Sequence, residues 1–191
     1  PRTAEDFIPA LVANNVLGGG YSARLNAEIR IKRGLSYGAG ASLPARTGTA
    51  PIVASAQTRN DAVPQVVDLM TAELERLGAE PIPESELGAR KAVLVGGFGR
   101  SVETTAGLAA QLGNLAAFDL PLERLSTYAD EILAVTPDEA AAAAMKYYDP
   151  AKAVLVVAGD AAQFWADIQQ RRANAERFDI DEVNFNSGSL R

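Results

Sequence analysis

The chain has 191 residues, of which 48% are apolar and 22% charged, and this composition suits one compact α+β unit with a real core rather than a disordered segment. Its net charge of −6 and pI near 4.8 argue against nucleic-acid binding, and it has no run of eighteen apolar residues that could span a bilayer. Cysteine and histidine are both absent, which excludes a disulfide, an imidazole-ligated zinc site and a Ser or Cys triad built by this chain alone.

The pattern of apolar residues predicts mostly helices along the chain. In several segments apolar side chains recur three or four residues apart, and capping residues and glycines mark the ends. Ser22 is expected to cap the second helix and Gly34 to end it as a C′ glycine, whereas Thr136 opens a later one with proline and an acid behind it. The helices are expected over residues 4–17, 22–32, 60–78, 84–98, 101–118, 122–135, 136–147 and 161–171.

Three segments predict strands. Residues 36–43 and 52–58 are extended stretches on either side of a turn-rich link, so a hairpin or neighbouring strand pair is expected. Residues 153–158 are continuously apolar, which is typical of a central strand buried on both faces. Three strands are few for a sheet covered by so many helices, so we expect a further strand before Pro1 and a chain cut or processed upstream. Residues 174–191 predict a polar tail.

Several motifs have an ordinary structural explanation. The triple glycine at 18–20 lacks the following Gly-Lys-Ser/Thr of a phosphate-binding loop, and it indicates a flexible joint between two helices. The glycines at 97 and 99 are a still weaker candidate for a phosphate-binding loop. Two pairs of acids could serve a glycosidase, and a set of three acids could bind a hard cation. A position on a solvated surface is the better explanation for all of these acids. These acids are Glu84 with Glu86, Asp130 with Glu131, and Asp179 with Asp181 and Glu182.

Arg30 and Tyr37 are the candidate binding residues. Arg30 lies in the last turn of a predicted helix and Tyr37 just inside the next strand, across the Gly34 turn, so both side chains can point into one space. Strand alternation would place Tyr37 on the same face as Ala39 and Ala41. A permanently charged guanidinium and a phenol hydroxyl suit peptide carbonyls or a developing oxyanion. From the residue types alone, the alternative is favoured, in which Arg30 and Tyr37 each have a structural role.

The segment from Leu17 to Tyr37 resembles the C-terminal-half signature of the pitrilysin/insulinase family of zinc metallopeptidases. It has the glycines, a small residue, Arg-Leu, a helix and then Arg-Gly-Leu-x-Tyr at the family's spacing, and a looser similarity continues to Asp160. The resemblance implies an α+β fold, with a mostly antiparallel sheet and helices packed on one face. It also implies an inactive C-terminal domain over residues 1–173 that lacks its first strand.

The resemblance also implies a function. In this family two homologous halves face each other around a chamber; one carries a His-x-x-Glu-His zinc motif, and the other offers an Arg and a Tyr that contact substrate. Those roles fall on Arg30 and Tyr37, with Gly18, Gly19 and Gly20 bordering the chamber. We therefore expect a non-catalytic half or partner subunit of a zinc endopeptidase that acts on unfolded peptides. The zinc is expected in the homologous domain or subunit, and not in this chain.

Two alternatives to this function remain open, as does the compartment. The chain could be an inert scaffold, like the inactive family members built into respiratory complexes, or a stand-alone peptide-binding module. An exported, periplasmic location is expected because cysteine-free chains of this kind are common among secreted bacterial proteins, and a cytoplasmic location is the alternative.

Overall fold

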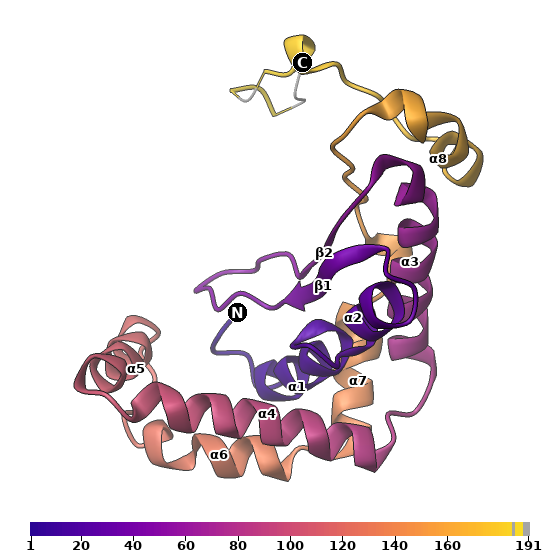
Figure 1. Ribbon diagram of the computed structural model, residues 1–191. Helices are drawn as coiled ribbons and strands as arrows, with labels where there is room; N and C mark the ends of the chain where they lie inside the picture. The colour runs from indigo at the N-terminus through magenta and orange to yellow at the C-terminus, as the bar shows by residue number, and fades with distance from the viewer. Residues whose placement is uncertain (185, 189–191) are drawn as a thin grey trace.

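The computed structural model of the protein describes residues 1–184 and 186–188. Helices pack against one side of a small antiparallel sheet, so the fold is α+β as the sequence predicted (Figure 1). The helices are α1 Phe7–Gly18, α2 Arg24–Asn26, α3 Val63–Ala79, α4 Glu84–Val102, α5 Thr105–Ala117, α6 Arg124–Ala134, α7 Pro137–Tyr147 and α8 Trp165–Arg171, with a π-helix at Ala27–Ile31 and 3₁₀ turns at Asn60–Ala62, Pro150–Lys152, Ala161–Gln163 and Ile180–Glu182.

The sheet is the predicted hairpin. Strands β1 Ser36–Ser42 and β2 Val53–Thr58 pair antiparallel, and the register is interrupted between Ser36 and Ala39. The side chains that face the core are small: Ala39, Ala41, Ala54 and Ala56. Small residues are needed here because α1 lies directly against β1, so one face of the sheet is covered by helix.

Helix α1 forms the centre of the core. The sequence predicted an amphipathic helix, but α1 is buried on nearly all sides, because α4, α7 and β1 all pack against it. Asn14, which lies inside the core, is therefore hydrogen-bonded at both side-chain atoms: its Nδ2 donates to the carbonyl of Ala41 at 3.1 Å, and Tyr148 donates its hydroxyl to Asn14 Oδ1 at 3.3 Å.

Helices α4 and α6 lie side by side beneath the core, with α5 projecting beyond the end of α4 (Figure 1). The helix predicted over residues 84–98 continues through Gly99 to Val102 as α4. The start signal at Thr136 is confirmed: its hydroxyl accepts from the Glu139 amide, and the Glu139 carboxylate accepts from the Thr136 amide.

The prediction of a buried central strand over residues 153–158 is wrong for the described structure. The segment forms no strand pairing, and Val154 and Val156 are 88% and 83% exposed. Only Val157 packs inward, against the small second cluster that contains Val63 and Phe164. The apolar run has the composition of a central strand, but in the described residues the sheet ends at two strands and does not reach it.

Candidate functional site

Arg30 lies on a π-helical segment. The expected continuous helix from Ser22 to Lys32 is instead the short α2 followed by the π-helix Ala27–Ile31, in which the Lys32 amide donates to the Ala27 carbonyl at 2.9 Å. Ser22 does not cap it. π-Helical turns are rare and are often found at functional sites, because the extra residue re-aims the side chains that follow.

The turn after the π-helix has the expected C′ glycine. Gly34 has φ of +62°, the left-handed region that glycine adopts without a Cβ penalty. Its amide donates to the Arg30 carbonyl at 2.9 Å, and the Leu35 amide donates to the Ile29 carbonyl at 2.9 Å. This tight turn brings the start of β1 back beside the π-helix that carries Arg30.

The structure brings Arg30 and Tyr37 together. The guanidinium carbon of Arg30 lies 4.8 Å from the centre of the Tyr37 ring and 5.1 Å from the centre of the Tyr21 ring, both within the range of cation–π interaction. The nearest acid in sequence, Glu28, is already paired with Lys32 and Arg33. Within the part of the chain that the structure describes, Arg30 has no carboxylate partner, so its hydrogen-bond donors remain available.

Tyr37 points away from the core because β1 bulges at this point. The expectation that Tyr37 shares a face with Ala39 and Ala41 is wrong: Tyr37 is 88% exposed, whereas the two alanines pack against the core. The register shift between Ser36 and Ala39 breaks the strand alternation. The Ser36 hydroxyl stabilises the bulge, since it accepts from the Gly38 amide at 3.0 Å and contacts the Gly38 and Gln57 carbonyls at 2.6 Å.

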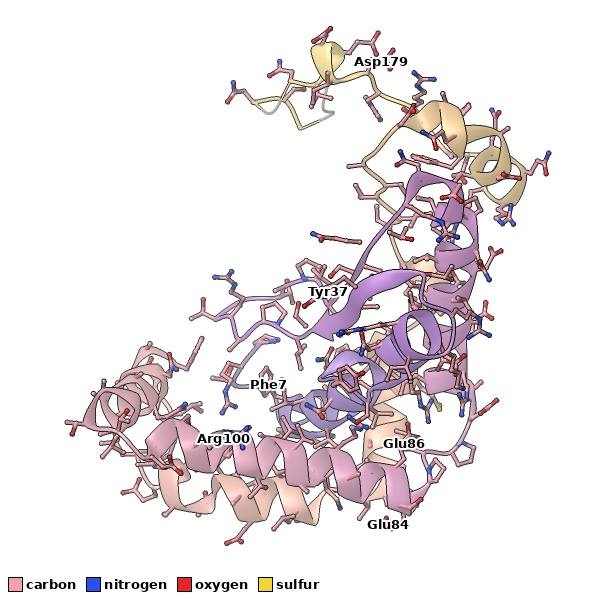
Figure 2. The ribbon with its side chains drawn as sticks, in the orientation of Figure 1. Phe7, Tyr37, Glu84, Glu86, Arg100 and Asp179 are labelled. Carbon is pink, nitrogen blue, oxygen red and sulfur yellow. The ribbon has the colours of Figure 1, made fainter. Side chains whose placement is uncertain are left out.

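An open hollow of about 400 Å³ lies beside Tyr37. Residues 34–37 of the turn and β1 line one side of it, and residues 57–59 at the end of β2 line the other. Figure 2 shows Tyr37 at the open side of the sheet, well separated from Glu84 and Glu86 at the beginning of α4. The surface around Tyr37 therefore offers a shallow, accessible place for an extended ligand.

The triple glycine is not the flexible joint that the sequence suggested. Gly18 is the last residue of α1, and a Cβ there would overlap the Ala41 nitrogen and lie 2.6 Å from the Gly40 carbonyl carbon. A Cβ at Gly19 would overlap Asn15, whereas Gly20 has nothing within 4 Å. The first two glycines thus allow α1 to pack tightly against β1, and only Gly20 lies in open space.

Several of the candidate acids are engaged in ion pairs, namely Glu84, Glu86, Glu131 and Asp179. Glu86, expected on a solvated face, is only partly exposed and accepts from Arg24 at 2.9 and 2.7 Å, which lowers its pKa. Hydrogen bonding to Arg124 likewise lowers the pKa of Glu131. Asp179 pairs with Arg177 at 2.9 Å, and Figure 2 shows it far from Tyr37. A glycosidase general acid needs a raised pKa, so neither Glu86 nor Glu131 suits that role.

The side chains of this chain do not fit a hydrolytic zinc ion. Zinc sites are built from His, Cys and carboxylate ligands, and the sequence contains no His or Cys. Over residues 1–184 and 186–188, no three Asp or Glu side chains gather into a group that could hold a metal ion. In the same part of the chain, no helix is both long enough and apolar enough to cross a bilayer.

Sequence reasoning missed two residues of this site. Tyr21 shares the Arg30 guanidinium with Tyr37, and Asn26 connects the segments that carry the two tyrosines. Tyr21 lies directly after the glycines and nine residues before Arg30. This spacing would indicate a contact between the two residues only if the segment between them were known not to be a regular helix. Asn26 gave no signal, because its role depends on contacts with residues distant from it in sequence.

Known proteins are similar to this chain in sequence and in fold. Residues 1–94 match the family model described as the peptidase M16 inactive domain. The peptidase M16 inactive domain from Pseudomonas fluorescens is 27% identical over 78% of this chain and 36% of its own, with a TM-score of 0.71. The comparison with curated proteins gives no match.

Two more distant structures share the fold. A protease from Helicobacter pylori is 19% identical over 78% of this chain and 36% of its own, with a TM-score of 0.63. The inactive peptidase domain of a protein assigned as a zinc protease, from Bordetella parapertussis, is 18% identical over 78% of this chain and 80% of its own, with a TM-score of 0.62. The chain spans about a third of the length of the Pseudomonas and Helicobacter proteins.

The family match covers the segment that carries Arg30 and Tyr37, and the fold similarity extends beyond it over most of the chain. This agrees with the resemblance to the pitrilysin/insulinase peptidases and with the lack of zinc ligands in the sequence. The chain resembles the inactive domain of the peptidase M16 family, whose model matches residues 1–94 and whose solved structure from Pseudomonas fluorescens shares the fold.

Proposed function

We propose that this domain binds substrate for a zinc-dependent endopeptidase whose metal is held by a homologous domain or subunit with a His-x-x-Glu-His motif. The observation that carries the proposal is the position of Arg30, whose guanidinium lies against two exposed tyrosine rings and has no carboxylate partner within the described residues. An inactive domain of a peptidase family that keeps an accessible, unneutralised arginine has a group suited to bind a peptide.

In this proposal Arg30 and Tyr37 donate hydrogen bonds to backbone carbonyls of an unfolded peptide. The guanidinium carries five N–H donors and the phenol one O–H, so the pair can hold one or two carbonyl oxygens in a fixed orientation. The bulge at Ser36–Ala39 presents the ring to solvent, and the hollow beside it leaves space for an extended chain. The chamber shared with the zinc-bearing partner lies on this side of the domain.

The test is turnover of a quenched peptide by this chain reconstituted with its zinc-bearing partner. A charge-assisted hydrogen bond contributes about 1.5–3 kcal/mol, so Arg30→Ala should lower kcat/KM roughly ten- to a hundredfold. Tyr37→Phe removes only the hydroxyl and should lower it about fivefold. Both variants should keep the wild-type circular dichroism spectrum, because neither side chain belongs to the core.

The matched control is Arg177→Ala. Arg177 is a solvent-accessible arginine paired with Asp179, which Figure 2 shows well separated from Tyr37. Its removal should leave kcat/KM unchanged. If Arg30→Ala also retains wild-type turnover in a folded complex, the substrate-binding role is rejected, and the alternative of an inert scaffold subunit is favoured.

An exported, periplasmic location is part of the proposal and has its own test. The chain contains no cysteine, so its folding does not depend on the redox state of the compartment. Fractionation of the source cells, with the chain detected by antibody, distinguishes the two compartments. Recovery with cytoplasmic markers alone would contradict an exported location and leave the substrate-binding proposal untouched.

A further inference from the structure

Asn26 connects the two segments that carry the tyrosines of the site. Its side chain is almost completely buried, with 4% of the residue exposed. Its Nδ2 donates to the Tyr21 carbonyl at 2.5 Å, and its Oδ1 accepts from the Ala39 amide at 3.2 Å. Tyr21 lies in the loop before α2, and Ala39 ends the bulge that contains Tyr37. One amide side chain therefore fixes the loop and the bulged strand relative to each other.

Tyr21 supplies the second ring against Arg30. An arginine side chain has many rotamers, and holding one of them requires an interaction that offsets the lost freedom. A carboxylate partner would hold the guanidinium but would also occupy its N–H groups. Contact with the Tyr21 and Tyr37 rings attracts the cation through the ring quadrupoles and leaves those donors unused. Two rings can therefore orient Arg30 while keeping it able to bind a carbonyl.

We propose that Tyr21 is a second aromatic contact that orients Arg30 for substrate, and that Asn26 is a positioning residue that keeps both tyrosines beside the guanidinium. This inference rests on the proposed function for its effect on turnover. Its structural part, the orientation of Arg30, can be measured without any activity. The two parts therefore have separate readouts.

The structural readout is the Nε–Hε resonance of Arg30 in a ¹H–¹⁵N spectrum of the full chain, assigned by its disappearance in Arg30→Lys. Ring currents of stacked tyrosines should shift this proton upfield. Tyr21→Leu should move it downfield, towards free arginine, and Tyr21→Phe should leave it nearly in place because the ring is retained. Asn26→Asp keeps an acceptor for Ala39 but cannot donate to the Tyr21 carbonyl, so it should move the resonance in the same direction as Tyr21→Leu.

The functional readout is kcat/KM of the reconstituted peptidase. Tyr21→Leu should lower it about two- to fivefold, the effect of one solvent-accessible cation–π contact, and Tyr21→Phe should restore it. Tyr147→Leu is the control, since Tyr147 is an exposed tyrosine at the end of α7, 4.8 Å from its own cation, Lys146. It should change neither the Arg30 resonance nor turnover.

The outcomes separate this inference from the proposed function. If Tyr21→Leu and Asn26→Asp leave the Arg30 resonance in place, the inference is overturned. The same holds if Arg30→Ala impairs turnover and Tyr21→Leu does not. If the resonance moves as expected but Arg30→Ala has no effect on turnover, the positioning is supported and the proposed function fails. Tyr21 is 66% exposed, so Tyr21→Leu remains informative even if the buried Asn26 variant does not fold.

Discussion

Arg24 and Glu86 form a two-pronged ion pair between α2 and α4. Arg24 Nε lies 2.9 Å from Glu86 Oε1 and Arg24 Nη2 lies 2.7 Å from Oε2, although the residues are 62 positions apart in sequence. The Arg24 side chain is only 4% exposed. Beside it, Arg90 donates to the carbonyl and hydroxyl of Ser22, at 2.9 Å each. Helix α4 thus holds the start of the segment that carries Arg30.

Replacing Glu86 should destabilise the fold. Glu86→Ala leaves the buried Arg24 guanidinium without its counter-charge, and breaking one side of such a pair costs about 3 kcal/mol. Urea unfolding followed by circular dichroism measures this as a lower midpoint. Glu75→Ala, at an exposed position of α3, is the control and should leave the midpoint unchanged. A Glu86→Ala midpoint equal to wild type would mean that α4 anchors α2 by packing alone.

The same pair predicts a loss of stability in acid. The hydrogen bonds from Arg24 lower the pKa of Glu86 below its ordinary value of 4.5. Its stabilising contribution is therefore complete above pH 4.5 and is lost as the pH falls through the lowered pKa, because the unfolded chain then binds more protons. Unfolding free energies measured between pH 3 and 7 should fall below about pH 4.5 and fall less steeply in Glu86→Gln. Equal slopes in the two proteins would contradict this assignment.

Gly18→Ala should destabilise the protein although alanine favours helices. The new methyl group would overlap the β1 backbone at Ala41, which cannot move without disturbing the sheet, and such overpacking costs about 2 kcal/mol. Gly88→Ala is the matched control: Gly88 lies inside α4 with nothing within 4 Å of its added Cβ. That variant should gain up to about 1 kcal/mol from helix propensity. Thermal unfolding of both variants should shift the midpoint in opposite directions.

Lys91 is expected to stabilise the end of α6. Its Nζ donates to the carbonyls of Leu133 at 3.1 Å and Val135 at 2.8 Å, which have no helical partner at this terminus. Lys91→Met keeps the buried stem but leaves both carbonyls without this donor, so the free energy of unfolding should fall by about 2 kcal/mol. Lys152→Met, at an exposed lysine, should have no measurable effect in the same urea titration.

The exposed apolar run at residues 153–158 predicts self-association of the chain. An extended segment with unpaired backbone groups and exposed valines is a template for pairing with another strand. Substituting lysine at both Val154 and Val156 should lower the apparent mass in concentrated solution and reduce binding of a hydrophobic dye. Val93→Lys, which alters a single exposed valine on α4, should change neither. If the double variant associates as strongly as the wild type, a different surface causes the self-association.

Part of the fold and part of the site could be predicted from local sequence. The glycine at 34 and the Thr136 start signal act within one turn of chain, and the structure shows both as expected. The pairing of β1 with β2 also follows from short-range alternation and a turn-rich link. The seven-residue spacing of Arg30 and Tyr37 indicated that both could reach one space, and the ring contact agrees with this.

Other features depended on contacts that local patterns do not contain. The sequence pattern gave no sign of the π-helix or the β1 bulge, and without the bulge Tyr37 would be expected to face the core rather than solvent. The apolar composition of residues 153–158 indicated burial, but burial depends on which other strands are beside it.

The sequence by itself determined that this chain provides no imidazole or thiolate ligand for zinc, because composition does not change on folding. It also determined the helix-rich α+β class, through periodicity and capping. Only the tertiary structure decided that Gly18 serves close packing and that Tyr21 and Asn26 join the site. These properties arise from side chains that meet across long stretches of chain, where the packed backbone, and not sequence distance, sets which groups are neighbours.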